Sequence, residues 1–229
     1  MMMAKEIGRS YIFSLTELEI LLKKIGCTKI FGLFEECEKV NQRETYEALA
    51  SMVSKEFIIR SGDQFLINRQ IRNALISVKN AERIIYIQQR YDMDIEYVCY
   101  VENKYVTVFC NSPLRKDALT MMHMEKYEFF NDMICSEFPE EEPVIADILS
   151  QADCKVTPIL REILNGKIPE QLKFMCRIYT SDGIVLNNFY VIDCLIALCS
   201  VSGQDENLKY DNYNKDQMKT FIERILFNI

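Results

Sequence analysis

The stretch Phe57–Ile67, which reads FIIRSGDQFLI, decides which fold is expected for the N-terminal part of the chain. Two short apolar runs flank Ser61-Gly62-Asp63, and this turn chemistry predicts a β-hairpin. Helical patterns precede it, and helices followed by a two-stranded hairpin are the local order of a winged helix. The stretch therefore leaves two alternatives open: the wing of a DNA-binding protein, or a hairpin that serves another purpose.

A helix is expected to begin at Ser14, because Ser14-Leu-Thr-Glu17 is a capping-box pattern. The apolar residues that follow recur at spacings of three and four and predict one buried stripe. Gly26 stands where a left-handed C-cap would end the helix. The stripe consists of Leu15, Leu18, Leu21, Leu22 and Ile25.

Two further helices are expected before the hairpin: a short one over residues 30–39 and a third over about Gln42–Glu56. In the third helix, the apolar residues expected to face the core are Tyr46, Leu49, Ala50 and Val53.

After the hairpin, the chain alternates between helical and strand patterns. The pattern from residue 70 is helical, and residues 83–88 fit a strand or a helix. The other expected elements are a hairpin of strands 95–101 and 105–110, a helix over 125–138, short helices over 144–149 and 156–164, a second hairpin of strands 172–180 and 184–199, a polar loop over 203–214 and a last helix over 215–227. The economical interpretation is one α+β domain over residues 1–229, with an antiparallel sheet, quasi-two-fold symmetry, a winged-helix-like subdomain at about 12–82 and a sheet-and-helix remainder at about 83–229.

Composition narrows the class of protein. The 229 residues are 49% hydrophobic and 27% charged, as in a soluble globular protein. Nine scattered cysteines, an odd number without a CxxC pair, indicate reduced thiols rather than disulfides or a zinc site. The first residues lack a signal-peptide pattern, and the longest apolar stretches are too short to span a membrane. We therefore expect a soluble, cytoplasmic protein.

Charge argues against nucleic acid as the partner, because such binding needs clustered Lys and Arg to neutralise phosphates. The net charge is −7. The recognition helix would be Gln42–Glu56, and it contains two basic residues, Arg43 and Lys55, against three glutamates. The longer segment 14–67 contains seven basic and nine acidic residues. A protein partner is therefore favoured over DNA.

The sequence offers no motif for catalysis, metal binding or cofactor binding. His123, the one histidine, lies in MMHM at the expected start of a helix, without the Ser, Cys or Asp pattern of a catalytic triad. Glycine-rich phosphate-binding motifs are missing as well. We expect a protein that is not an enzyme, with no cofactor and no metal.

The order of elements resembles one known family, the EspG-type secretion-associated proteins. The resemblance rests on the first helix Ser14–Gly26, the helix end Ala48–Ile58, the Ser61-Gly-Asp turn and the stretch 71–81 that leads to strands. It is a pattern of hydrophobic spacing over most of the chain, without a catalytic motif.

This resemblance implies a cytoplasmic, non-enzymatic chaperone or adaptor of type VII protein secretion, which binds helical-hairpin substrate proteins through its central sheet and a C-terminal helical region. The candidate partner-binding residues are aromatic residues of the first large hairpin, since Tyr is favoured at interfaces; they are Tyr97, Tyr100, Tyr105 and Phe109. The alternative is a winged-helix transcription regulator whose C-terminal half senses a ligand or dimerises.

Overall fold

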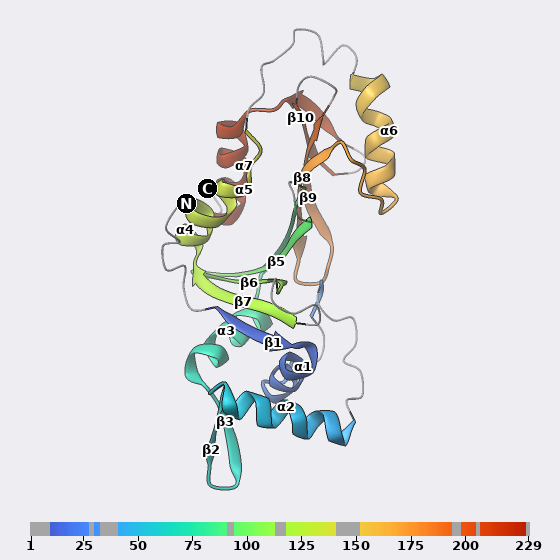
Figure 1. Cartoon of the computed structure of the whole chain (residues 1–229). Coiled ribbons are helices and arrows are strands. Elements are labelled where there is room, and N and C mark those ends of the chain that lie inside the picture. The colour runs from blue at the N-terminus through green and yellow to red at the C-terminus, as the bar shows by residue number, and fades with distance from the viewer. Residues whose placement is uncertain are drawn as a thin grey trace, which may run out of the picture. The chain divides into compact units, whose positions relative to one another are not determined.

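The structure, a computed structural model, describes residues 10–27, 30–32, 41–90, 94–112, 118–140, 152–193, 198–204 and 207–227. The chain forms two compact units: unit 1 consists of Met1–Ile84 and Tyr97–Glu125, and unit 2 consists of Ile85–Glu96 and Lys126–Ile229. Each unit combines helices with antiparallel strand pairs, which confirms the α+β class (Figure 1). Of the short helix expected over residues 30–39, only residues 30–32 are described, and they form an isolated bridge residue and a turn; the helix expected over 144–149 lies outside the described residues.

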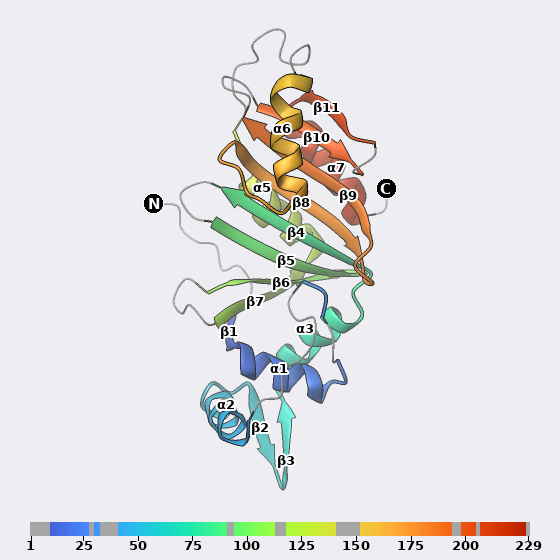
Figure 2. The same cartoon turned by 90° about the vertical axis from the view of Figure 1, so that its right-hand side faces the viewer.

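Unit 1 contains a sheet whose strands follow the order β1-β7-β6-β5 (Figure 2). Strand β1 pairs with β7, β7 with β6 and β6 with β5, all antiparallel. The elements of this unit are β1 (Tyr11–Ser14), α1 (Leu15–Lys24), α2 (Gln42–Ser54), β2 (Ile58–Ser61), β3 (Gln64–Ile67), α3 (Arg69–Lys79), most of β5 (Asp94–Glu102), β6 (Tyr105–Asn111) and β7 (Ala118–Glu125).

The hairpin expected at Phe57–Ile67 is confirmed as a separate two-stranded sheet of β2 and β3. Ser61 pairs with Gln64, so Gly62 and Asp63 form the turn, and Gly62 has a φ of 63°. Phe57 and Ile58 are buried at the base of the hairpin, whereas Ile59, Phe65 and Leu66 are exposed. The expected winged-helix-like subdomain falls within the first chain segment of unit 1.

Helix α1 begins at the expected capping box. Ser14 Oγ accepts a hydrogen bond from the Glu17 amide at 3.2 Å, and a Glu17 carboxylate oxygen accepts one from the Ser14 amide at 2.8 Å. Leu18, Leu21 and Leu22 are buried as expected. Leu15, the first residue of the helix, is exposed instead of buried, whereas Glu17 and Leu18 of the same turn are buried.

In helix α2 the expected core face is wrong. Tyr46 and Val53 are 63% and 45% exposed, whereas Ala48 and Met52 are buried. Apolar residues lie on more than one side of this helix, so spacing alone could not select the buried side. Packing against α1 selects the side that carries Ala48 and Met52.

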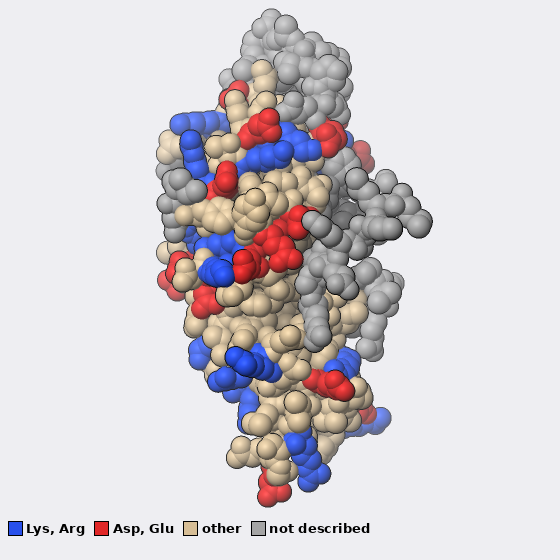
Figure 3. Space-filling view, turned by 90° about the vertical axis from the view of Figure 1, so that its left-hand side faces the viewer, with Lys and Arg blue, Asp and Glu red and all other residues tan. Residues whose placement is uncertain are grey.

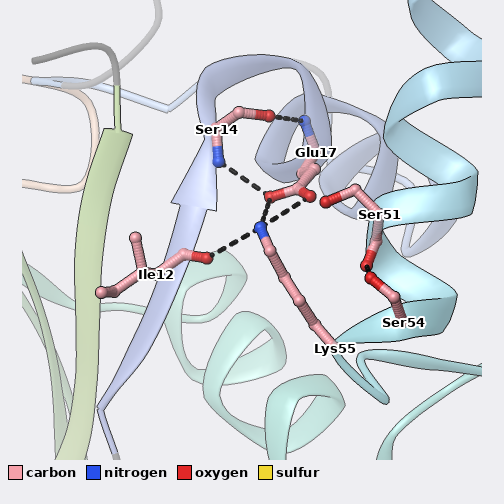
Figure 4. Close-up of polar contacts among 6 residues, drawn as sticks. All are labelled: Ile12, Ser14, Glu17, Ser51, Ser54 and Lys55. Atoms are coloured by element: carbon pink, nitrogen blue, oxygen red, sulfur yellow. Dashed lines mark hydrogen bonds and ion pairs between the residues drawn. The ribbon is translucent and has the colours of Figure 1, made fainter. Parts of the chain in front are cut away.

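The Glu17 carboxylate joins three elements of unit 1 (Figure 4). Glu17 is 1% exposed. Besides capping α1, its two carboxylate oxygens accept hydrogen bonds of 2.7 and 2.8 Å from Nζ of Lys55, the residue directly after α2. Lys55 Nζ also donates to the carbonyl of Ile12 in β1 at 3.3 Å. A buried charge needs both a counter-ion and hydrogen bonds, and here it receives both.

We predict that Glu17→Ala destabilises the protein by about 3 kcal/mol, because it removes a helix cap and the counter-ion of Lys55. The matched control is Glu47→Ala, which breaks the exposed Arg43–Glu47 pair of 2.9 Å and should cost less than about 0.5 kcal/mol. Urea unfolding measures both changes. Equal losses for the two variants would contradict the role given to Glu17.

Helices α1 and α2 end in the same way, but with different residues in the left-handed position. Gly26 has a φ of 73°, and the amide of Cys27 reaches back to the Leu22 carbonyl at 2.9 Å. At the end of α2 this position is held by Glu56, with a φ of 59°. The Phe57 amide donates to the Met52 carbonyl at 2.8 Å, which completes the same C-cap motif.

Because only glycine adopts this conformation without steric cost, Glu56→Gly should stabilise the protein by about 1 kcal/mol, and Gly26→Ala should destabilise it by a similar amount. The urea midpoint of each variant tests this. A loss of stability for Glu56→Gly would show that the Glu56 side chain has a structural role that outweighs its backbone strain.

Unit 2 contains strands in the order β4-β8-β9-β10-β11. Helix α6 packs on this sheet and forms a core of Val156, Leu160 and Ile163 against strand residues such as Tyr190. The elements are most of β4 (Arg83–Arg90), α4 (Lys126–Glu128), η1 (Phe129–Ile134), α5 (Cys135–Glu137), α6 (Ala152–Leu164), β8 (Leu172–Thr180), β9 (Val185–Asp193), β10 (Leu198–Gly203), β11 (Lys209–Asn212) and α7 (Lys215–Phe227).

Three expectations for the second half of the chain are corrected. The long strand expected over 184–199 is two antiparallel strands, β9 and β10, because Leu198 pairs with Asp193. The expected polar loop contains β11. The helix expected over 125–138 forms as α4, η1 and α5, but it begins at Lys126, so His123 lies in strand β7 and not at the start of that helix. The residues MMHM do not by themselves distinguish a strand from a helix. The segment forms a strand because it pairs with β6.

Candidate partner-binding surfaces

The end of the β5–β6 hairpin presents an exposed aromatic cluster in unit 1. Glu102 pairs with Tyr105 across a turn in which Asn103 has a φ of 24°. Tyr105 is 38% exposed and stacks on His123, with ring centroids 5.1 Å apart. Lys104 Nζ lies 5.5 Å from the Tyr105 ring centroid and 2.8 Å from a Glu125 carboxylate oxygen, and this hydrogen bond raises the pKa of Lys104.

The structure narrows the set of four candidate partner-binding residues. Tyr100 and Phe109 are buried and pack edge to face, with ring centroids 5.8 Å apart. The Tyr100 hydroxyl donates to the Phe31 carbonyl at 2.7 Å, which satisfies its polar group inside the core. Tyr105 is exposed and Tyr97 is half-buried, so these two are the members of the set that a partner can reach.

His123 is held in one tautomer by Thr107. The buried Thr107 hydroxyl donates its one proton to the Ala74 carbonyl at 3.1 Å. Its 2.9 Å contact with His123 Nδ1 is therefore a hydrogen bond that His123 donates, which leaves Nε2 as an acceptor. Burial lowers the pKa of His123 from the usual 6.5, and the Glu102 carboxylate acts in the opposite direction.

His123 lies beside an open pocket of unit 1. The open pocket of about 320 Å³ beside it is lined by Tyr11, Gln70, Asn73 and His123. The Tyr11 hydroxyl donates to Gln70 Oε1 at 2.8 Å, so these two groups are already paired.

The described residues contain no cluster of three or more His, Cys, Asp or Glu side chains placed to hold a metal ion. Nor does any described helix have the length and apolar character that crossing a membrane requires.

We predict that the neutral His123 makes stability depend on pH. The folded protein binds a proton at His123 less readily than the unfolded chain does, so this residue destabilises the fold as pH falls below about 6.5. His123→Asn retains an N–H donor for Thr107 but does not titrate. Between about pH 7 and pH 5, where histidine titrates, wild type should lose more stability than His123→Asn in urea unfolding; an equal or smaller loss would contradict the lowered pKa.

A second exposed surface lies in unit 2, at the beginning of β9. Ile184, Val185 and Leu186 are three consecutive exposed aliphatic residues, and Ile184 is 64% exposed. A register shift between Ile178 and Tyr179 in the facing strand β8 interrupts the regular pairing here. Such irregularities bend a strand end, and the regular burial of β9 begins only at Asn188.

Sequence reasoning missed this aliphatic surface, because the three residues resembled the start of a buried strand. The available signal was the absence of alternation directly after the Ser181-Asp-Gly183 turn. A run of exposed aliphatic residues is more informative than scattered ones, since contiguous apolar patches mark interaction sites. We refer to Lys104, Tyr105 and His123 as the Tyr105 surface. We refer to Ile184, Val185 and Leu186 as the Ile184 surface.

Comparison with known proteins shows similarity at the level of the fold. No family model matches the chain, and no curated protein sequence matches it. Among solved structures, the fold is similar to the Mycobacterium tuberculosis type VII secretion system chaperone EspG5, solved in complex with the PE25–PPE41 dimer. The similarity has a TM-score of 0.59 and covers 95% of this chain and 96% of EspG5, at 8% sequence identity. The chain therefore has an EspG-like fold, as the order of its elements indicated.

Proposed function

From this EspG-like fold we propose that the protein is a cytoplasmic, non-enzymatic chaperone or adaptor of type VII protein secretion, which binds a helical-hairpin substrate. The observation that carries the proposal is the coverage of the similarity: nearly the whole of both chains aligns, rather than one common subdomain. EspG5 is a chaperone seen with a protein dimer, and a protein partner is the corresponding expectation for this chain.

The two exposed surfaces support this proposal, because each has the chemistry that a helical partner requires. The Ile184 surface presents aliphatic side chains that can cover apolar residues exposed on a helical partner. The Tyr105 surface adds an aromatic ring flanked by Lys104 and Glu125, so an apolar contact is surrounded by charge. Apolar centres with polar rims are the usual anatomy of protein interfaces.

The alternative, a winged-helix transcription regulator, retains support from the β2–β3 hairpin. The charge of α2 argues against it: Glu44 and Glu47 are exposed on this helix, and Arg43 is already paired with Glu47 at 2.9 Å. A helix with this surface repels the phosphate backbone.

The proposal is tested by co-expression with small helical exported proteins. The expected result is a soluble complex and a substrate that becomes insoluble when this chain is omitted. Tyr105→Ala and Ile184→Ser should each weaken the complex about tenfold or more, or about 1.4 kcal/mol, as expected for interface anchors. Titration calorimetry measures the change.

Matched controls separate binding from general surface effects. Tyr46→Ala removes another exposed tyrosine of unit 1, on α2, and Ile168→Ser removes another exposed isoleucine of unit 2; neither residue belongs to the two surfaces. Both controls should bind with wild-type affinity. Failure of every helical protein to form a complex would overturn the proposal, and equal losses in the test and control variants would overturn the assignment of the two surfaces.

A further inference from the structure

A groove in unit 1 belongs to neither of these surfaces. It has a volume of about 720 Å³ and lies between the end of α1, strand β3 and helix α3. Its apolar lining includes Phe65 and Leu66 of β3, which are 39% and 52% exposed, and the half-buried Ile67 and Ile76. Exposed aromatic and aliphatic residues beside a concave surface indicate a binding groove.

The charges that line the groove are all positive. Lys24, Arg69, Arg72 and Lys79 contribute to its lining and are exposed, and the described lining residues include no acidic one. This local charge contrasts with the net charge of −7 for the chain. Figure 3 shows Lys and Arg side chains, with some Asp and Glu side chains among them, over the lower part of the face drawn.

The two arginines stand where a helix disfavours cations. Arg69 and Arg72 lie at the beginning of α3, where the helix dipole presents partial positive charge, and the first turn of α3 contains no acidic residue to compensate. Neither arginine forms an ion pair among the residues that the structure describes. By contrast, Lys79 Nζ is fixed by a hydrogen bond to the Ile25 carbonyl at 3.0 Å. Approach of an anionic group would relieve the unfavourable charge at this end of α3.

We propose that this groove binds an acidic amphipathic helix of a partner protein. The apolar stripe of such a helix would contact Phe65, Leu66 and Ile76, and carboxylates along its sides would pair with Arg69, Arg72 and Lys24. This is the helix-in-groove mode of recognition, with charge complementarity that sets the orientation of the helix. DNA fits less well, because phosphates do not use the apolar lining and the adjacent hairpin carries Asp63 beside its one cation, Arg60.

The groove is independent of the proposed secretion role, because its residues do not overlap with the Tyr105 surface or the Ile184 surface. The probe is a fluorescent, stapled helical peptide of about 15 residues, with leucines at positions i, i+3, i+4 and i+7 and glutamates elsewhere. Two comparison peptides replace the glutamates by lysine or the leucines by serine. Fluorescence anisotropy with the full chain, at about 0.15 M salt, measures binding.

The acidic amphipathic peptide should bind, and the other two should not. The double variant Arg69→Glu/Arg72→Glu should weaken binding by about tenfold or more, as should Leu66→Ser. The double variant Arg161→Glu/Lys167→Glu has the same change in net charge at exposed positions of unit 2 and should bind as wild type does. Amide chemical shifts should change at residues 65–67 and along α3, and circular dichroism should confirm that each variant is folded.

Three results would overturn the proposal. Equal binding of the serine peptide would show that charge alone attracts the probe. Absence of binding by the acidic amphipathic peptide would show that the groove does not accept such a helix. Binding of a short DNA duplex, lost in Arg69→Glu/Arg72→Glu while the acidic peptide does not bind, would assign the groove to nucleic acid. None of these results depends on whether a secretion substrate binds elsewhere.

Discussion

The ion pair between Glu17 and Lys55 is the constraint on which the arrangement of unit 1 depends. One buried carboxylate starts α1, and through Lys55 it fixes the residue at which α2 ends. Lys55 Nζ also lies 5.3 Å from the ring centroid of Phe57, and Phe57 packs on Phe13 of β1, with ring centroids 4.6 Å apart. The direction in which the chain leaves α2 and enters the β2–β3 hairpin is therefore set by a small polar centre inside an aromatic cluster.

The hairpins in the two units are divided into a buried part and an exposed end. Most of β5 and β6 faces the core, which is why Tyr100 and Phe109 serve packing, and their ends leave Tyr105 in solvent. In unit 2 the same division separates the buried part of β9 from Ile184. A protein partner can reach these ends without disturbing the core. Exposed strand ends of this kind are surfaces that a protein partner can contact while the core stays intact.

Local chemistry in the sequence was sufficient to predict features that depend on a few neighbouring residues. The Ser14–Glu17 capping box, the Gly26 helix end and the turn at Gly62-Asp63 all form as expected, because each is determined by hydrogen bonds or backbone angles within about five residues. The order of these elements also indicated an EspG-like fold at 8% identity, since the order of elements is retained when individual residues change.

Features that depend on distant partners could not be predicted in this way. The buried face of α2 is chosen by contact with α1, and MMHM becomes a strand because it pairs with β6. The burial of Tyr100 depends on Phe31, which is 69 residues away. The basic groove could not be recognised from the net charge of residues 14–67, because that segment does not include α3. Helix α3 contains three basic residues and no acidic one.

The central claim is that this scaffold binds a helical protein through the exposed ends of its hairpins. Hydrogen-exchange mass spectrometry of the chain, alone and in complex with a co-expressed helical exported protein, tests this claim most directly. The account predicts slower exchange in peptides that contain residues 102–106 and 183–187, with little change in the already buried middle of β6. Exchange that is unchanged in both regions of a purified complex, with protection elsewhere, would contradict it.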